Sequence, residues 1–296
     1  MMEGQATMGL DSFSALVSRE DREIDLARAC LQIAEDAYPG LDVDGYVGEI
    51  ARFAGRLRTR LAPGAAAEDR VIALNEFLFG DLGFSGNGGD YHDPRNSYLN
   101  EVLDRRRGIP ITLSVLYMEI GRRIELPLEG VSFPGHFLVR LPLRGGTLVL
   151  DPFEGGVPQS EAELRKRLKR AIPRVATPGR RDGAGGVAVT DLPLDPFLEP
   201  ASNRQILARL LRNLKGVYRE KDDPLRLLQV LNRMLIVAPE AAGELRDRGY
   251  LYQRLECWRP ALQDLSGYLE REPDAADVEE VRARVMELSR RCARLN

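Results

Sequence analysis

The chain has 296 residues, of which 44% are hydrophobic and 29% charged, and its formal net charge is −3. This length and composition are typical of a globular protein with one large or two ordinary domains. The small net charge, with both signs interspersed, excludes a general electrostatic attraction to nucleic acid or to an anionic membrane. We therefore expect neither as a partner.

Cysteine usage and the N-terminal sequence bear on the cell compartment. The three cysteines lie far apart without a CxxC spacing, which indicates neither a disulfide framework nor a zinc site, and we expect no metal or other cofactor. The first residues include Asp11 and Glu20 where a signal peptide would be basic and then apolar, and no apolar run of about 18 residues occurs. We expect a cytoplasmic protein.

Three segments before residue 80 carry apolar residues at helical spacing, which predicts a helical layer at the start of the fold. They cover residues 18–38, about 43–61 and 68–79. The first of them is expected to open at Ser18.

Residues 80–97 are rich in Gly, Asn, Asp and Pro, which predicts a shaped loop of the kind that often lines a site. Tyr91, His92 and Asn96 are its candidate binding residues. His92 stands between two aspartates, so a metal site is one interpretation. However, no HxH or HxxxH spacing supports a metal, and Asp-His-Asp-Pro is also ordinary turn chemistry.

A second candidate region surrounds Gly108-Ile109-Pro110, where a polar segment ends and a helix to Arg123 is predicted. Pro110 suits the first helical position, because its missing N–H and fixed φ cost nothing there. Arg107, the last of three consecutive arginines, is a candidate for holding an anionic ligand. A solvated helix end accounts for the same arginines.

Residues 128–133, 136–141 and 147–151 are β-prone runs, which predicts a three-strand antiparallel meander. If the last two runs pair about a loop centred between Leu143 and Arg144, His136 lies directly opposite Asp151. Strand alternation then gives this hairpin one apolar face and one face with the ionisable pair.

Directly opposed cross-strand residues lie close enough for a carboxylate to accept the imidazole N–H and fix its tautomer. His136 and Asp151 would form the base and its orienter in a catalytic triad. The alternative is a buried histidine that is hydrogen-bonded to Asp151 for structural reasons only.

A helix N-terminus followed by a His and an Asp on neighbouring strands resembles the transglutaminase-like, papain-like group, in which a Cys opens the helix. The motifs LNEFLF, NSYLNEVLDRRRGIPITLSVLY, GVSFPGHFLVR and LDPFEGG resemble the bacterial SirB-type family, a transglutaminase-like domain followed by tetratricopeptide repeats. Pro110 occupies the position of the group's Cys, and Glu125 stands where such proteins tend to have Gly. The resemblance implies an α+β fold with a small antiparallel sheet and an all-α tail.

The missing Cys leaves two functional interpretations. The first is a non-catalytic relative, a pseudoenzyme with a regulatory or scaffolding role, which binds a protein or peptide through its repeats or its cleft, where Pro110 and Ser114 are further binding candidates. The second is a hydrolase or acyltransferase of amidase or peptidase type, with His136 as base, Asp151 as its orienter and Thr112 or Ser114 as nucleophile.

Ser160-Glu-Ala-Glu163 has the spacing of a capping box and predicts a helix to about Ile172. Five basic residues on this helix are expected to form a solvated face. A nucleic-acid patch is the alternative, although no aromatic residue is interleaved with them.

Residues 177–186 have the composition of a flexible linker, which predicts a transglutaminase-like domain over residues 1–186 and a tetratricopeptide-like helical domain over 187–296. Beyond the linker the chain repeats with a period of 34, because Leu231 returns as Leu265 and Pro239 as Pro273. About two and a half units fit before the chain ends, fewer than the roughly three needed for independent stability. We therefore expect the array to pack on the N-terminal domain.

Overall fold

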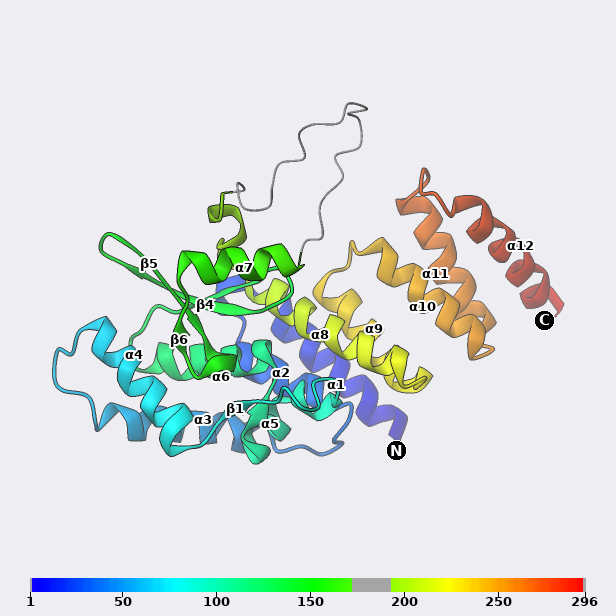
Figure 1. Cartoon of the computed structure of the whole chain (residues 1–296). Helices are drawn as coiled ribbons and strands as arrows, with labels where there is room; N and C mark the ends of the chain where they lie inside the picture. The colour runs from blue at the N-terminus through cyan, green and yellow to red at the C-terminus, as the bar shows by residue number, and fades with distance from the viewer. Residues whose placement is uncertain (1, 172–192, 295–296) are drawn as a thin grey trace, which may run out of the picture.

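The protein is described from a computed structural model, which covers residues 2–171 and 193–294. It is an α+β fold in which a layer of helices packs beside a small sheet, and a helical array follows along the chain (Figure 1). The helices are α1 (Met2–Val17), α2 (Leu26–Ala34), α3 (Val43–Arg58), α4 (Ala67–Asn75), α5 (Leu99–Arg105), α6 (Pro110–Arg123), α7 (Glu161–Ala171), α8 (Asn203–Glu220), α9 (Pro224–Val237), α10 (Ala242–Arg254), α11 (Trp258–Arg271) and α12 (Val278–Arg294).

The predicted helices are present, with one wrong boundary. Ser18 follows the end of α1 instead of opening the next helix, and α2 begins at Leu26. The cause is local, because the side chain of Asp25 accepts a hydrogen bond from the Arg28 N–H and caps α2.

The sheet has four antiparallel strands in the order β3-β4-β5-β6, one more than the predicted meander. A second, two-stranded parallel pair joins the loop after α4 to the segment before α6. The strands are β1 (Ser85–Gly86), β2 (Arg107–Gly108), β3 (Glu129–Val131), β4 (Leu138–Leu143), β5 (Gly146–Asp151) and β6 (Val157–Pro158).

Helix α6 is the centre of the N-terminal domain. All residues from Pro110 to Gly121 are buried, including the polar Thr112, Ser114 and Glu119. A helix that is buried on every side must be surrounded by other elements. Here α2, α3, β4 and α8 all contact it.

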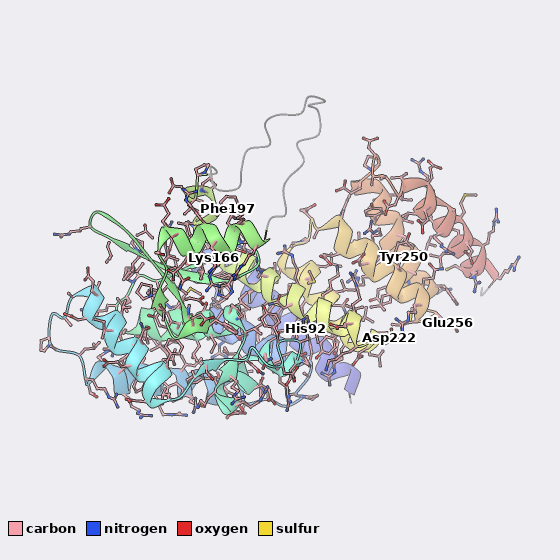
Figure 2. The ribbon with its side chains drawn as sticks, in the orientation of Figure 1. His92, Lys166, Phe197, Asp222, Tyr250 and Glu256 are labelled. Atoms are coloured by element: carbon pink, nitrogen blue, oxygen red, sulfur yellow. The ribbon has the colours of Figure 1, made fainter. Side chains whose placement is uncertain are left out.

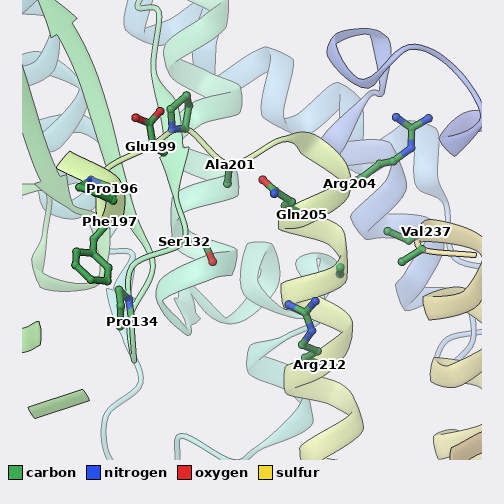
Figure 3. A pocket seen from close by; sticks show the side chains of 13 residues that line it. Ser132, Pro134, Pro196, Phe197, Glu199, Ala201, Arg204, Gln205, Arg212 and Val237 are labelled. Carbon is green, nitrogen blue, oxygen red and sulfur yellow. The ribbon is translucent and has the colours of Figure 1, made fainter. Parts of the chain in front are cut away.

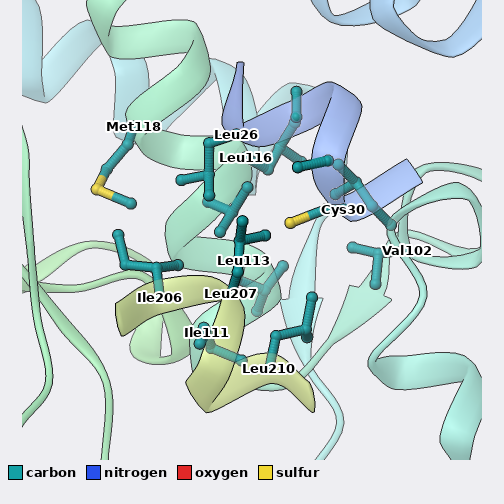
Figure 4. Close-up of a cluster of buried hydrophobic side chains, with 14 of the residues drawn as sticks. Leu26, Cys30, Val102, Ile111, Leu113, Leu116, Met118, Ile206, Leu207 and Leu210 are labelled. Carbon is teal, nitrogen blue, oxygen red and sulfur yellow. The ribbon is translucent and has the colours of Figure 1, made fainter. Parts of the chain in front are cut away.

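The first two helices of the C-terminal array belong to the same core. Ile206, Leu207 and Leu210 of α8 pack among Ile111 and Leu113 of α6 (Figure 4). This agrees with the expectation that a short repeat array packs on the N-terminal domain. The linker predicted over residues 177–186, and with it the boundary at residue 186, lies outside the described residues.

The helices after α9 form a separate, smaller core, which contains Ala261 and Leu265 of α11 and Val281 of α12, whereas Leu251 of α10 belongs to the large core. The 34-residue period corresponds to the helix pairs α8–α9 and α10–α11, and α12 is the additional half unit. Gly249 is required by this packing, because a Cβ there would lie 2.8 Å from the side chain of Leu265. Among the described residues, no helix combines the length and the apolarity needed to cross a lipid bilayer.

Candidate functional site

The hairpin of β4 and β5 brings His136 and Asp151 together, with a register that differs from the predicted one. Val139 pairs with Leu150, and the pairing continues to Leu143 and Gly146, so the turn consists of two residues. The predicted loop centre was therefore wrong by one position, and directly opposite placement of His136 and Asp151 was also wrong. Because the resulting slip is two residues, each side chain keeps its predicted face.

His136 lies just before β4 and reaches Asp151 diagonally. Its Nε2 atom is 3.0 Å from each of the two carboxylate oxygens. The Asp151 side chain is fully buried, whereas 12% of the His136 side chain is exposed. The ring of Phe153 stands edge-on to the imidazole at 6.0 Å between centroids. Since Asp151 occupies Nε2, Nδ1 is the ring nitrogen left for a nucleophile or a ligand.

Asp151 has two further partners. The Phe153 backbone N–H donates to it at 3.1 Å, and the Arg167 guanidinium donates at 2.7 Å. These bonds compensate the cost of burying the carboxylate, and they fix its orientation.

Arg167 is a site residue that sequence reasoning missed, because the basic residues of α7 were all expected to be solvated. Leu164 and Leu168 of α7 are buried against Leu138 of β4 and its neighbours. Arg167 is three residues after Leu164 and next to Leu168, so it lies at the edge of the same buried face. The apolar pair four residues apart was the signal that could have identified it.

The helix start at Pro110 agrees with the prediction, and the nearby hydroxyls are used internally. The Thr112 hydroxyl donates to the Asn96 carbonyl oxygen at 2.8 Å and accepts from the Ile109 N–H at 3.1 Å. The Ser114 side chain is fully buried and its hydroxyl has no partner among the described residues. Within those residues no hydrogen bond joins either hydroxyl to His136.

The loop candidates divide into a buried and an exposed group. Asn96 is fully buried and binds Asn87 at 3.0 Å and the Asp90 carbonyl at 2.6 Å, so its amide holds the loop together. His92 is exposed, and its Nδ1 atom lies 3.4 Å from Glu220 at the end of α8 (Figure 2). Tyr91 is 42% exposed.

Arg107 is exposed on β2, which pairs in parallel with β1. It therefore belongs to the two-stranded sheet whose second strand comes just before α6 along the chain. The tightly packed Gly108 lies on the same strand. A Cβ on Gly108 would lie 2.7 Å from the Thr112 hydroxyl, which explains the glycine at this helix start.

A cavity of about 300 Å³ opens beside the imidazole; we call it the histidine cavity. It is lined by Pro134, Gly135, His136, Arg167, Arg170 and Ala171. Behind it, Arg209 of α8 donates to the His136 carbonyl oxygen at 3.3 Å and to the Ser132 hydroxyl at 3.2 Å. The loop that carries His136 is thus held by a helix from the first repeat.

Comparison with known proteins agrees with this architecture. The family described as the transglutaminase-like superfamily matches residues 44–212, and the tetratricopeptide repeat matches residues 214–286. A UPF0162 protein of Xylella fastidiosa (strain Temecula1) is 41% identical over 280 residues, which cover 95% of each chain. The chain belongs to the UPF0162 family, which includes SirB1.

Other members are more distant. Protein SirB1 of Salmonella typhimurium is 29% identical over 238 residues, 80% of this chain and 82% of the relative. The YchA protein of Escherichia coli (strain K12) is 29% identical over 258 residues, 87% of this chain and 88% of the relative. Among solved structures, menin superimposes with a TM-score of 0.41 at 11% identity, over 88% of this chain and 68% of menin, a likeness too weak to bear on fold or function.

Proposed function

We propose that this SirB1-family chain is non-catalytic and binds protein or peptide segments, in a regulatory or scaffolding role in the cytoplasm. The observation that carries the proposal is Pro110 at the first position of α6, where the transglutaminase-like group has its nucleophilic Cys. A proline side chain has no nucleophilic atom. The His136–Asp151 pair then serves to hold the loop beside the histidine cavity.

The neighbouring hydroxyls do not replace the missing thiol easily. A helix N-terminus is worth about 0.3–1 kcal/mol, which lowers a thiol pKa usefully but does not ionise a hydroxyl. A hydroxyl nucleophile would therefore depend wholly on His136 as its base. The Thr112 hydroxyl instead donates a hydrogen bond to the Asn96 carbonyl oxygen, and Ser114 is fully buried.

The repeats support the binding role. Tetratricopeptide repeats stack helix pairs into extended surfaces that generally contact other proteins. In this chain the first pair also contacts the His136 loop through Arg209. A partner bound to the array and a segment bound in the histidine cavity would therefore both act on α8.

The proposal is tested first by chemistry at the helix start. Pro110→Cys should have a thiol pKa well below the ordinary value of about 8.5, because the helix dipole and His136 both favour the thiolate. The variant is made with Cys257→Ser and Cys292→Ser, while Cys30 stays, since burial raises the pKa of its thiol. Adding His136→Ala should remove the depression.

The control is the protein with Pro110 in place, treated with a hydroxyl-directed acylating probe. Thr112 and Ser114 should remain unlabelled, as seen by peptide mass spectrometry. Rapid labelling of either hydroxyl that disappears in His136→Ala would overturn the non-catalytic proposal.

A photo-crosslinking residue tests the binding role directly. Placed at Tyr91, an exposed residue of the loop over residues 80–97, it should capture a protein partner in native cells. The matched control is Ile72, which is 55% exposed on α4. Equal capture at both positions, or none at Tyr91, would count against a binding surface on this loop.

The second candidate function is the hydrolase or acyltransferase named above. The observation that favours it is the His136–Asp151 contact at 3.0 Å, which lies beside an open cavity of about 300 Å³. The labelling experiment decides between the two functions, because the enzyme requires a His136-dependent hydroxyl.

A further inference from the structure

Pro134, on the loop before His136, lines two cavities whose polar groups differ. The larger one, of about 480 Å³, lies between this loop and α8 (Figure 3). Its lining includes Glu199 and Arg212, which have opposite charges and are both exposed. Exposed charges of both signs are screened by solvent and select no particular ligand. The smaller histidine cavity, in contrast, has charged side chains of one sign only.

The side chains that line the histidine cavity can donate hydrogen bonds to an anion. Among the described residues, no carboxylate or hydroxyl side chain lines it. A guanidinium group has five N–H donors and no acceptor. The lining consists of two guanidinium groups, one imidazole and three residues without a polar side chain: Arg167, Arg170, His136, Pro134, Gly135 and Ala171.

Arg167 is fixed in place and still has N–H groups to offer. Its guanidinium donates to the buried Asp151 carboxylate at 2.7 Å, and Leu164 and Leu168 of the same helix are buried. Among the described residues it has no other hydrogen-bond partner, and none of its remaining N–H groups is a buried unpaired atom. A ligand would therefore meet a guanidinium that is already oriented, which reduces the entropy lost on binding.

Asp151 compensates only part of the positive charge beside the cavity. Its carboxylate accepts from His136, from the Phe153 N–H and from Arg167. Arg170 is exposed and has no ion pair or hydrogen bond to any of the described residues. The α7 macrodipole places about half a negative charge at this end of the helix, which is less than the one guanidinium charge left over. The cavity therefore attracts anions.

The loop side of the cavity adds a backbone donor. Pro134 and Gly135 are the central residues of a β-turn, which the His136 N–H closes on the Phe133 carbonyl oxygen at 3.1 Å. The φ of Gly135 is +70°, as a type II turn requires at this position. Its N–H donates to no described residue. A Cβ on Gly135 would lie 3.1 Å from the Ala171 Cβ, so the glycine lets the turn approach α7 closely.

Donors that come from both a turn and a helix suit a tetrahedral anion better than a planar one. A carboxylate offers two oxygens in one plane. A phosphate monoester offers three terminal oxygens and a charge of about −1.5 to −2, and arginine is the residue that recognises it most often. The cavity volume of about 300 Å³ also leaves room for a small organic group beside Pro134 and Ala171.

We propose that the histidine cavity binds a phosphate monoester, with the phosphate oxygens on Arg167, Arg170 and the Gly135 N–H. Such binding goes beyond the proposed binding of protein segments, and it does not depend on whether the protein is an enzyme. Because Arg167 and His136 share the Asp151 carboxylate, a bound phosphate changes the electrostatic environment of the imidazole.

Histidine NMR tests the proposal directly, because the chain has only two histidines, His92 and His136. The full chain is prepared with isotope-labelled histidine and titrated with O-phosphoserine at constant pH and ionic strength. The ring resonances of His136 should shift to saturation with a Kd of about 1 mM or less, whereas those of the exposed His92 should not move. Unphosphorylated serine should cause no shift.

Arg170→Gln should weaken the binding of O-phosphoserine about tenfold, as expected when a charge-assisted hydrogen bond is lost. The matched control is Lys166→Gln, which removes a positive charge from an exposed position on the same helix, outside the cavity lining, and should leave the Kd nearly unchanged (Figure 2). Circular dichroism checks that both variants are folded.

A second pair of variants has matched side-chain size. Ala171→Glu should abolish the binding, because a carboxylate in the lining would occupy the two guanidinium groups. Ala171→Gln fills the same space without a charge and should weaken the binding less. Equal effects of the two substitutions would show that the cavity does not select an anion, and would overturn the proposal.

The source of the phosphate group is identified with the peptide Gly-Ala-phosphoserine-Ala-Gly, blocked at both ends. Binding at least about tenfold tighter than that of O-phosphoserine would assign the phosphate to a phosphorylated protein. Equal or weaker binding would assign it to a small metabolite. Both results support a phosphate monoester site.

Three further results would each overturn the proposal. One is an unmoved His136 resonance at about 10 mM O-phosphoserine. Another is the same loss of affinity in Arg170→Gln and Lys166→Gln. The third is binding of glutarate as tight as that of O-phosphoserine, which would identify a general anion site.

Discussion

The two helix pairs of the C-terminal array share a period of 34 residues but differ in what covers them. In α8–α9, Ile206, Leu207 and Leu210 belong to the large core of the N-terminal domain. In α10–α11, Ala261 and Leu265 belong to a small core shared with α12. The first pair is thus part of the domain that it follows. Within the described residues, the second pair packs mainly on other repeat helices, and only Leu251 of α10 among its buried residues belongs to the large core.

The salt bridges show the same contrast. Arg233 of α9 is 1% exposed, contacts Asp36 at 2.8 Å and lies over the Phe13 ring at 4.7 Å. It therefore connects the first pair to the N-terminal helices. Arg248 of α10 binds Asp264 of α11 at 2.7 Å, within the second pair. A repeat motif specifies how its own two helices meet and leaves their other neighbours open.

Truncating one leucine in each pair should give the largest effects. Leu210→Ala should lower the free energy of unfolding of the N-terminal domain by about 2–5 kcal/mol, because it opens a cavity in the large core. Leu265→Ala should lower only the stability of α10–α12 by a similar amount. Hydrogen exchange at α6 separates the two results, and equal loss of protection there in both variants would remove the distinction.

Breaking the Arg233–Asp36 contact should come next. Arg233→Met keeps most of the packing on Phe13 but leaves Asp36 without its partner, and should cost about 3 kcal/mol. This is the lower end for a buried pair, since 21% of the Asp36 side chain is exposed. The matched control is Arg219→Met, an exposed pair with Asp247 worth at most about 1 kcal/mol. Urea unfolding midpoints measure both costs. Equal costs would show that the Arg233–Asp36 contact contributes no more than an exposed pair.

Two glycines in corresponding helices should respond with opposite sign. Gly249→Ala in α10 places a Cβ 2.8 Å from Leu265 and should destabilise the second pair by about 1–3 kcal/mol. Gly216→Ala in α8 meets nothing within 4 Å and should stabilise the protein by about 0.4–1 kcal/mol. Thermal unfolding followed by circular dichroism measures both. If the unfolding temperature rises in both variants, helix propensity outweighs the contact with Leu265.

Acid should loosen the second pair, and this is the smallest effect. The hydrogen bond from Tyr268, with Arg246 beside it, holds the pKa of Asp277 below its ordinary value, and Asp247 is lowered because Lys215 and its neighbours outweigh its burial. A depressed carboxyl pKa stabilises the fold above the unfolded value of about 3.9, and this contribution is lost as the pH falls through the folded value.

The fluorescence of Trp258, the single tryptophan of the chain and part of α11, reports this change. Between pH 5 and pH 2 its emission should shift before the circular dichroism of the whole chain is lost. Asp277→Asn should reduce the shift. An unchanged acid profile in that variant would show that Asp277 does not contribute.

Much of the candidate site followed from local sequence. The helix start at Pro110, the common face of His136 and Asp151 and the glycine-rich shaped loop were all predicted from turn residues and strand alternation. The hairpin register was not predicted correctly, because Arg144-Gly145-Gly146 allows more than one turn centre. Strand alternation fixes only the face of the sheet on which each side chain lies. Arg167 and Arg209 were missed for a different reason, since their partners lie on elements that are not adjacent in sequence.

The sequence by itself determined the elements and their faces: a proline with fixed φ begins α6, and period-two and period-34 patterns set the hairpin faces and the repeats. Tertiary structure alone decided the partners. It placed Arg167 on Asp151 and joined α8 to the core around α6. Backbone angles and periodicity are local properties that a short segment fixes, whereas the residue that pairs with a given charge depends on which surfaces, distant along the chain, exclude water between them.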